Sequence, residues 1–283
     1  MYKVLERRDL NENVAMLVID APFIAKKAQP GQFIIFRIDE QGERVPLTIA
    51  DYDAEAGTVT IIFQKVGKST VKLAELKVGE SLLDFVGPLG KASHFGEDIK
   101  KAAVIGGGLG TAIAYPQAKK LHSLGVEVTA ISGFRNKELI ILEKEVGEVS
   151  DKLIITTDDG SNGNKGFVTT ALEAEINAGE KFDLVIAIGP LIMMKFVSQL
   201  TKKYSIKTLV SMNPIMIDGT GMCGGCRVTV GGKTKFACID GPDFDGHEID
   251  FDEAMRRQNV YKAEENKSFE DHKCKVGLDG GNK

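Results

Sequence analysis

The stretch Asp218-Gly-Thr-Gly-Met-Cys223-Gly-Gly-Cys226-Arg-Val-Thr-Val-Gly-Gly-Lys-Thr-Lys-Phe-Ala-Cys238 holds three of the four cysteines of this 283-residue chain. Glycines between them let the backbone turn tightly around a small ligand. The spacing D-x4-C-x2-C-x11-C is the plant-type [2Fe-2S] pattern C-x4-C-x2-C…C with an aspartate in the first position. We therefore expect Asp218, Cys223, Cys226 and Cys238 to hold an iron–sulfur cluster.

Other interpretations of these cysteines stay open at this point. A C-x2-C pair with a later cysteine also suits structural zinc, although zinc sites usually bring a second close pair of Cys or His. The cysteines could also be inert. Cys274, in the polar C-terminal tail, is a rival fourth ligand. Asp218 is preferred because Cys274 lies far along the chain in a segment that looks poorly anchored.

The composition is that of an ordinary soluble protein, with 43% hydrophobic and 27% charged residues and a formal net charge of -4. No basic patch points to nucleic acid. The longest apolar run, near Leu184 to Met194, is too short to span a bilayer, and the N-terminus lacks the apolar core of a signal peptide. We expect a cytoplasmic protein without nucleic-acid or membrane partners. Its cysteines then favour a metal site over disulfides.

Three domains are predicted. Residues 1–97 contain short β-rich runs separated by turn residues, which indicates a small antiparallel β-barrel. Residues 98–210 alternate short apolar strands with helices, the pattern of a parallel α/β sheet. Residues 211–283 hold the cysteine stretch and the tail. The clearest strands of the first part are residues 14–19, 32–38 and 58–64.

Two loops of the predicted barrel carry chemistry. Residues 44–51, Arg-Val-Pro-Leu-Thr-Ile-Ala-Asp, follow a predicted strand and offer the cation of Arg44 close to the hydroxyl of Thr48. Gly67-Lys-Ser69-Thr70 opens a helical stretch, where backbone N–H groups and hydroxyls can receive a phosphate. An ordinary helix N-cap is the equal alternative for the second loop, because Ser and Thr are favoured there anyway.

The second domain opens with a strand, a glycine loop and a helix. Lys101–Ile105 leads into Gly106-Gly-Gly-Leu-Gly-Thr111 and then the helix predicted over Ala112–Leu124. This order is typical of sheets that hold a nucleotide at the carboxyl ends of their strands. The match is partial, because Thr111 stands where the dinucleotide fingerprint has its last glycine.

Later loops of this domain are further nucleotide candidates. Asp158-Asp-Gly-Ser and Gly189-Pro190 each follow a predicted strand, with a plain polar turn as the alternative. The turn after the second strand contains Arg135 and Lys137, which can accept a 2′-phosphate or have no such role. The residues alone leave the choice between NADH and NADPH open.

In this order, the three parts resemble the ferredoxin-NADP reductase superfamily, in the branch with a C-terminal [2Fe-2S] domain. That branch includes the electron-transfer subunits of dihydroorotate dehydrogenase B. It also includes the small subunits of heterodimeric NADH-dependent reduced ferredoxin:NADP oxidoreductases, also described as sulfide dehydrogenases, which are the best match. The motifs that carry the resemblance are residues 44–51, 86–90, 106–112, 159–169, 213–228 and 236–246.

The resemblance implies three cofactors and their contacts. FAD would bind in the barrel and NAD(H) on the α/β domain, with a [2Fe-2S] cluster at Asp218 and the three cysteines. The implied flavin contacts are Arg44, Pro46, Leu47, Thr48, Gly67, Ser69 and Thr70. The implied nucleotide contacts are Gly107, Gly108, Gly110, Thr111, Asp159, Gly189 and Pro190.

The implied function is that of an electron-transfer subunit between NADH and a larger flavin/iron–sulfur partner subunit, within an electron-bifurcating complex that reaches ferredoxin through that partner. Alternatives are the corresponding subunit of dihydroorotate dehydrogenase B, a stand-alone flavin reductase with structural zinc, and a non-catalytic nucleotide sensor. Two residues depart from relatives. The dihydroorotate branch has Cys where this chain has Asp218, and the superfamily's arginine stands three residues before the hydroxyl, whereas Arg44 stands four before Thr48.

Overall fold

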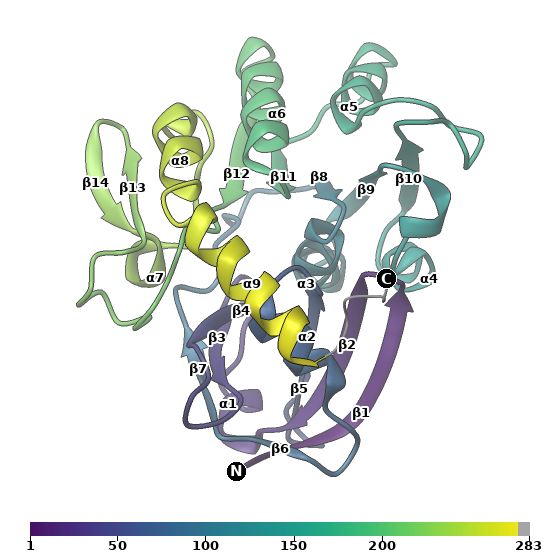
Figure 1. Cartoon of the computed structure of the whole chain (residues 1–283). Coiled ribbons are helices and arrows are strands. Elements are labelled where there is room, and N and C mark those ends of the chain that lie inside the picture. Colours follow the sequence, from purple (N-terminus) through teal and green to yellow (C-terminus); the bar gives the residue numbers. More distant parts are fainter. Residues whose placement is uncertain (277–283) are drawn as a thin grey trace.

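The computed structural model describes residues 1–276, which form a β-barrel below a layered α/β sheet, with the cysteine-rich region at one side (Figure 1). The barrel sheet has the strand order β6-β1-β2-β5-β4-β3-β7, and all its pairings are antiparallel. Its first and last strands in that order, β6 and β7, are consecutive in the chain, so the sheet curls until it nearly closes. Its strands are β1 (Tyr2–Asn11), β2 (Val14–Asp20), β3 (Phe33–Arg37), β4 (Val45–Asp53), β5 (Thr58–Gln64), β6 (Ser81–Leu82) and β7 (Asp84–Leu89).

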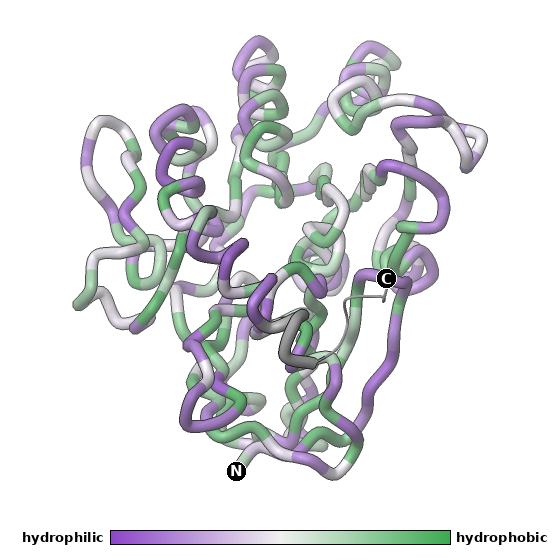
Figure 2. The backbone as a smooth tube through the Cα atoms, viewed as in Figure 1, coloured by the Kyte–Doolittle hydropathy of each residue, from purple (hydrophilic) through white to green (hydrophobic). Residues whose placement is uncertain are grey.

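The barrel interior is filled by alternate side chains of these strands. Ile34 and Phe36 of β3 point into one buried cluster with Ile61 and Phe63 of β5, as expected of the period-two alternation in strands. Helices α1 (Pro22–Ala25) and α2 (Lys68–Glu75) add apolar residues to the same cluster. The long strand β1 is mostly exposed and hydrophilic along its outer run (Figure 2).

The second sheet has the order β10-β9-β8-β11-β12-β15, in which five strands are parallel and β15 is antiparallel. Helices cover both faces, as parallel sheets require. Its strands are β8 (Lys101–Gly107), β9 (Glu127–Phe134), β10 (Lys152–Thr157), β11 (Leu184–Ile188), β12 (Lys207–Ser211) and β15 (Asp243–Asp245). Its helices are α3 (Gly110–Ser123), η1 (Lys137–Leu139), α4 (Glu143–Glu148), α5 (Val168–Asn177) and α6 (Leu191–Lys203).

Successive residues of the central strand β8 serve opposite faces of this sheet. Ala102 and Val104 pack with residues of α3, whereas Ala103 and Ile105 pack with residues of α5 and α6. The barrel joins the α3 side through a shared apolar cluster, and Lys119 of α3 also forms an ion pair with Asp51 of β4. The two sheets therefore meet along a continuous interface.

The C-terminal region leaves the second sheet and returns to it. A hairpin of β13 (Arg227–Val230) and β14 (Lys233–Phe236) is followed by α7 (Ala237–Asp240), and β15 then pairs with β12. Helix α8 (Phe251–Gln258) packs against α6 and β13, and α9 (Lys262–Val276) contacts α2 of the barrel. Within residues 1–276 no helix is long and apolar enough to cross a membrane.

The predicted barrel and parallel α/β sheet are confirmed, as are the three barrel strands and the helices after the two glycine loops. One local prediction is wrong. Residues 44–51 were expected to form a loop, but Val45–Asp53 is strand β4, paired with β3 and β5. Its proline is accommodated at the start of the strand, where a missing N–H is tolerated. The domain ranges 1–97, 98–210 and 211–283 stay our proposal, with β15 lending its three residues to the second sheet.

Candidate functional site

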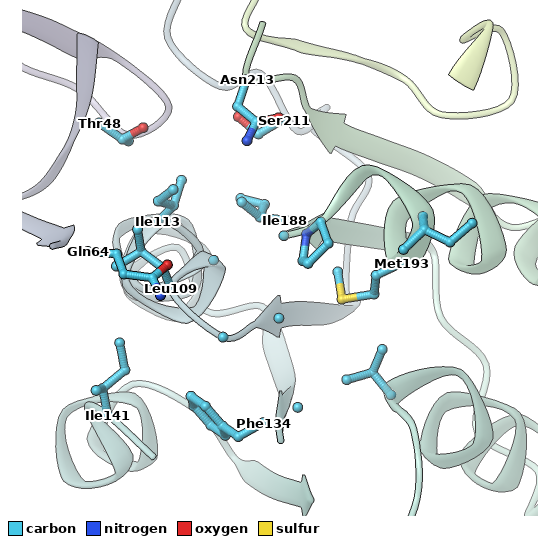
Figure 3. Close-up of a pocket in the computed structure, with 18 of the residues that line it drawn as sticks. Thr48, Gln64, Leu109, Ile113, Phe134, Ile141, Ile188, Met193, Ser211 and Asn213 are labelled. Carbon is cyan, nitrogen blue, oxygen red and sulfur yellow. The ribbon is translucent and has the colours of Figure 1, made fainter. Parts of the chain in front are cut away.

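A cavity of about 980 Å³ lies where the barrel meets the carboxyl ends of the parallel strands. This volume is near the upper end of the roughly 300–1,000 Å³ usual for small-molecule sites. Figure 3 shows Thr48 from the barrel facing Ser211 and Asn213 across it, with Ile113 and Ile188 below them in this view. The cavity is thus built from both sheets and from the chain that leaves β12.

The glycine loop after β8 forms one wall. Gly107, Gly108 and Gly110 line the cavity at the start of α3, whose N-terminus favours negative charge. A Cβ atom on Gly110 would collide with the carbonyl oxygen of Ile188, so only glycine lets the start of α3 come this close to the end of β11. Gly189 and Pro190 line the same wall. These five predicted nucleotide residues are therefore brought together.

Thr111, the remaining member of that loop, is placed differently. Its side chain is only 2% exposed, it does not line the cavity, and its hydroxyl has no hydrogen-bond partner among the described residues. It packs under the loop, beside Gly106. The structure thus gives Thr111 a position that supports the loop from below.

The loops after β9 and β10 are joined by backbone hydrogen bonds. The N–H of Asp158 donates to the carbonyl of Phe134 at 3.0 Å, and the N–H of Asp159 donates to that of Arg135 at 3.3 Å. Asp158 and Arg135 line the cavity, but Asp159 does not. The carboxylate of Asp159 accepts hydrogen bonds from Ser161, which lower the pKa of that carboxyl. Asp158 is therefore accessible to a ligand in the cavity, whereas the predicted Asp159 stabilises the turn.

On the barrel side, Pro46, Leu47 and Thr48 line the cavity as the flavin prediction requires. Arg44 does not. Its guanidinium lies against the cysteine-rich stretch, where Nε donates to the carbonyl of Ile217 at 3.0 Å. Arg44, which stands one residue further from the hydroxyl than the superfamily's arginine does, therefore contacts the cysteine-rich stretch and not the cavity.

The second predicted flavin loop lies outside this cavity. Thr70 accepts hydrogen bonds from the N–H groups of Val66 and Gly67, at 3.1 and 3.2 Å, so it caps the start of α2. The hydroxyl of Ser69 donates to the carboxylate of Glu43 at 2.6 Å. An anionic acceptor therefore already stands beside Ser69, whereas Thr70 takes the capping role that the sequence left as the alternative.

The four predicted cluster ligands lie in two pairs. Three of them belong to residues 217–226, which we call the cluster loop, and the fourth is Cys238. The Sγ of Cys223 lies 3.1 Å from Oδ1 of Asp218, and the Sγ atoms of Cys226 and Cys238 are 3.2 Å apart. In the described part of the chain, no three His, Cys, Asp or Glu side chains gather around one point as a single ion requires. Two pairs of donors fit a two-iron cluster, in which each iron takes two protein ligands.

Local hydrogen bonds hold the exposed half of this site. Oδ2 of Asp218 accepts from the Thr220 hydroxyl at 2.8 Å and from the Met222 N–H at 2.9 Å. Together with the Cys223 thiol, which contributes most, these donors lower the pKa of the Asp218 carboxyl. The Gly225 N–H approaches the Cys223 sulfur at 3.4 Å. Asp218 is therefore kept ionised, as a metal ligand must be.

The other half of the site is buried. Cys226 and Cys238 are each 1% exposed and belong to the core cluster that includes Phe33 and Ile35 of the barrel. Burial raises the pKa of the Cys238 thiol to about 12 in the chain without metal. Gly219, with φ of +76°, lies so close to the barrel that a Cβ atom would be 2.8 Å from Ile35. The cluster loop is thus docked on the barrel wall. The side chain of the rival ligand Cys274 lies outside the described residues.

A buried polar joint lies beside the cavity. Oδ2 of Asp243 accepts from the Ser93 hydroxyl at 2.5 Å and from Gln117 of α3 at 3.3 Å. Oδ1 of Asp243 and Oε1 of Gln117 have no partner among the described residues. Burial is the main cause that raises the pKa of the Asp243 carboxyl. This joint ties the connection between the two sheets to α3 and β15.

Sequence reasoning missed several lining residues. Gln64 ends β5 and Ser211 ends β12, and the lining residues that follow β12 are Met212, Asn213, Pro214 and Met216, together with Pro242. Thr48, Gln64 and Asn213 make no side-chain hydrogen bond within the part of the chain that the structure describes. The position of Ser211 at the carboxyl end of a parallel strand was the available signal. Nothing in the sequence marked Gln64.

Comparison with known proteins addresses these two sites. Residues 213–250 match the family described as the iron–sulfur cluster binding domain of dihydroorotate dehydrogenase B. The electron transfer subunit homolog of dihydroorotate dehydrogenase B (NAD(+)) from Thermotoga maritima is 44% identical over 270 residues, which cover 95% of each chain. The chain belongs to the family of these electron-transfer subunits.

Members of this family differ in their distance from the chain. The electron transfer subunit of dihydroorotate dehydrogenase B from Streptococcus mutans is 33% identical over 88% of this chain and 97% of its own. A solved structure of an NADH-dependent reduced ferredoxin-NADP oxidoreductase superposes with a TM-score of 0.90 at 43% identity, covering 95% of this chain and 97% of that one.

These relatives confirm the predicted superfamily, the fold class and the role of an oxidoreductase subunit in electron transfer. The cofactor set predicted from the sequence, FAD, NAD(H) and a [2Fe-2S] cluster, is confirmed at the level of the family. The relatives themselves are subunits of larger complexes.

Proposed function

We propose that the chain passes electrons between NADH and a larger flavin/iron–sulfur partner subunit, as the small subunit of an electron-bifurcating NADH-dependent reduced ferredoxin:NADP oxidoreductase. The observation that carries this proposal is that the predicted flavin and nucleotide residues line one cavity. Thr48 of the barrel lines the same cavity as the nucleotide loop at Gly107–Gly110, and the cluster loop is docked on the barrel beside it. When bound, FAD would accept a hydride from NADH and release its two electrons one at a time to a [2Fe-2S] cluster.

The chain's own residues place the ligands. Thr48, Gln64 and Asn213, which have no side-chain partner among the described residues, would offer hydrogen-bonding groups to the polar edges of the two ring systems. The N-terminus of α3 and Gly189-Pro190 would hold the nucleotide's pyrophosphate. The hydroxyl of Ser69, which now donates a hydrogen bond to the Glu43 carboxylate, would donate to the FAD pyrophosphate instead once the pyrophosphate displaces that carboxylate.

NADH is the proposed nucleotide because of Asp158. A carboxylate at the end of a strand beside the nucleotide loop accepts a hydrogen bond from a ribose 2′-hydroxyl and repels a 2′-phosphate. Arg135 also lines the cavity there, but Asp158 stands next to Asp159, so the local charge is negative. We therefore propose that NADH is bound in preference to NADPH.

The cluster would bind through Asp218 and Cys223 on one iron and through Cys226 and Cys238 on the other, following the two observed pairs. The carboxylate favours the ferredoxin-linked enzyme over dihydroorotate dehydrogenase B, whose first ligand is a cysteine. Met222 is 88% exposed and Ile217 51% exposed beside the exposed Cys223, so the partner is proposed to dock over this end of the loop. The cytoplasm is the proposed compartment, because it keeps such thiols reduced.

The testing experiment is an anaerobic reconstitution with FAD, iron and sulfide, followed by absorption and EPR spectra before and after NADH. A bleached flavin band and a reduced [2Fe-2S] signal are expected. Bound zinc without iron would support the stand-alone reductase, and a flavin that NADH does not bleach would support the nucleotide sensor. An Asp218→Cys variant with an unchanged EPR spectrum and potential would remove Asp218 from the ligand set.

A further inference from the structure

Arg44 connects the barrel to the cluster loop. It lies in the connection between β3 and β4, immediately before the residues that line the cavity. Its Nε donates to the carbonyl of Ile217 at 3.0 Å, and Nη2 reaches the carbonyl of Asp218 at 3.5 Å. An exposed guanidinium from the flavin side therefore holds the backbone at the first proposed cluster ligand.

Two more arginines hold the same loop from other elements. Arg227 of β13 donates to the carbonyl of Gly224 at 2.6 Å. Arg257 of α8 donates to the carbonyl of Gly225 at 3.3 Å. The cluster loop is thus held by three cations that come from the barrel, the hairpin and a C-terminal helix.

The contact of Arg227 also orients a donor to the cluster. The Gly224 carbonyl and the Gly225 N–H belong to one peptide unit, so they point in opposite directions. The carbonyl points outward to Arg227, and the N–H points toward the Cys223 sulfur at 3.4 Å. Hydrogen bonds to ligand sulfurs are among the factors that set the potential of an iron–sulfur cluster.

The charges of these three arginines are not neutralised by an ion pair within the described part of the chain. Arg7, Arg8 and Arg37 each form an ion pair with a carboxylate. Among the described residues, none of the three arginines at the cluster loop has such a partner. A cluster with thiolate, carboxylate and sulfide ligands is anionic and gains a further negative charge on reduction, which nearby cations stabilise.

We propose that Arg44, Arg227 and Arg257 form a cationic clamp that orients the cluster loop and raises the reduction potential of its cluster. The clamp makes one-electron transfer from the flavin to the cluster more favourable. Arg227 acts through the Gly225 N–H as well as through charge, whereas Arg44 acts mainly through charge. This inference rests on the proposed function, because it needs the cluster at Asp218 and the three cysteines.

The test is an EPR-monitored redox titration of the reconstituted full chain with each arginine changed to Gln and to Lys. Each Gln variant is expected to lower the cluster potential, most strongly Arg227→Gln, and Arg44→Lys is expected to restore most of the wild-type value. Arg8→Gln is the matched control, since Arg8 pairs with Glu145 away from the loop, and its potential is expected to equal the wild-type value. Wild-type potentials in all three Gln variants would overturn the proposal.

Two further measurements keep the proposal testable if the variants lose their iron. Raising the ionic strength screens exposed charges, so the wild-type cluster potential is expected to fall with salt. A wild-type potential that ignores salt, together with Lys variants that behave as the Gln variants do, would overturn the charge effect. Loss of FAD from Arg44→Gln with an unshifted cluster potential would assign Arg44 to the flavin instead. A wild-type chain that forms no [2Fe-2S] cluster would defeat the proposed function, not the clamp alone.

Discussion

The cavity and the cluster loop treat their polar groups in opposite ways. In the cavity, Thr48, Gln64 and Asn213 are left without protein partners inside the described part of the chain. In the cluster loop, the donors of Asp218 and Cys223 already contact each other and the loop's own N–H groups. Unpaired polar groups are available to an organic ligand such as a flavin or a nucleotide, whereas donors that already lie in pairs suit a metal cluster. In our proposal the chain thus combines a cavity for FAD and NADH with a permanent site for the cluster.

The largest effect is expected from Cys226→Ser, which tests whether the cluster loop is a permanent site. Cys226 is buried and paired with Cys238, so the variant should lose the reduced-cluster EPR signal completely after reconstitution. NADH should still bleach the flavin, because the cavity lies apart from this sulfur. Cys274→Ser is the control and should keep its signal; loss of the signal there instead would move the fourth ligand to Cys274.

The next effect concerns the cavity wall at Gly110. Gly110→Val would press a side chain against the Ile188 carbonyl and destabilise the chain by about 1–3 kcal/mol, the usual range for overpacking. Urea unfolding of the apoprotein measures it. Gly147→Ala in α4 is the control, because its Cβ would meet only ordinary contacts and alanine favours helix. Equal stability of both variants would show that the glycine loop can yield.

Asp158→Ser tests the proposed preference of the cavity for NADH over NADPH. Removing the carboxylate should raise the efficiency of NADPH relative to NADH by about tenfold, which corresponds to about 1.4 kcal/mol. Stopped-flow flavin reduction with each nucleotide gives the ratio. Asp159→Ser is the neighbouring control, because its carboxylate faces Ser161 in the turn. If both variants change the ratio equally, only the summed charge matters and Asp158 has no special position.

The smallest effect tests the joint at Asp243 between the two regions. The pKa of this carboxyl is raised above its ordinary value of 3.8, so it stabilises the fold fully only below that value. That stability is lost as the pH rises through the raised native pKa. Asp243→Asn should therefore lose less stability than the wild type between acidic and neutral pH. Urea midpoints over this range check the slope, and parallel curves for the two proteins would contradict it.

The sequence predicted most of the fold because its signals are local. Glycine loops before helices and short β-rich runs report on their own neighbourhood, so β8, α3 and the barrel strands were found. The proposed cluster ligands were also predicted from a local pattern, since Asp218 to Cys226 lie within one loop. Asn213 and Gln64 could not be found, because only the packing of the two sheets brings them to one cavity. The contact of Arg44 with the Ile217 carbonyl could not be predicted for the same reason, since that partner lies in a loop far away in sequence.

The pairing of Ser211 with Asp243 has a consequence for the engineering of this chain. Residues 212–242, with every proposed cluster ligand, leave the second sheet and return to it at the same rung. They therefore form one excursion between two paired strands, β12 and β15. Because Asn213, Met216 and Pro242 of this excursion also line the cavity, the proposed cluster site and part of the cavity wall belong to one segment, and an iron-binding segment grafted from another member would have to keep those lining residues.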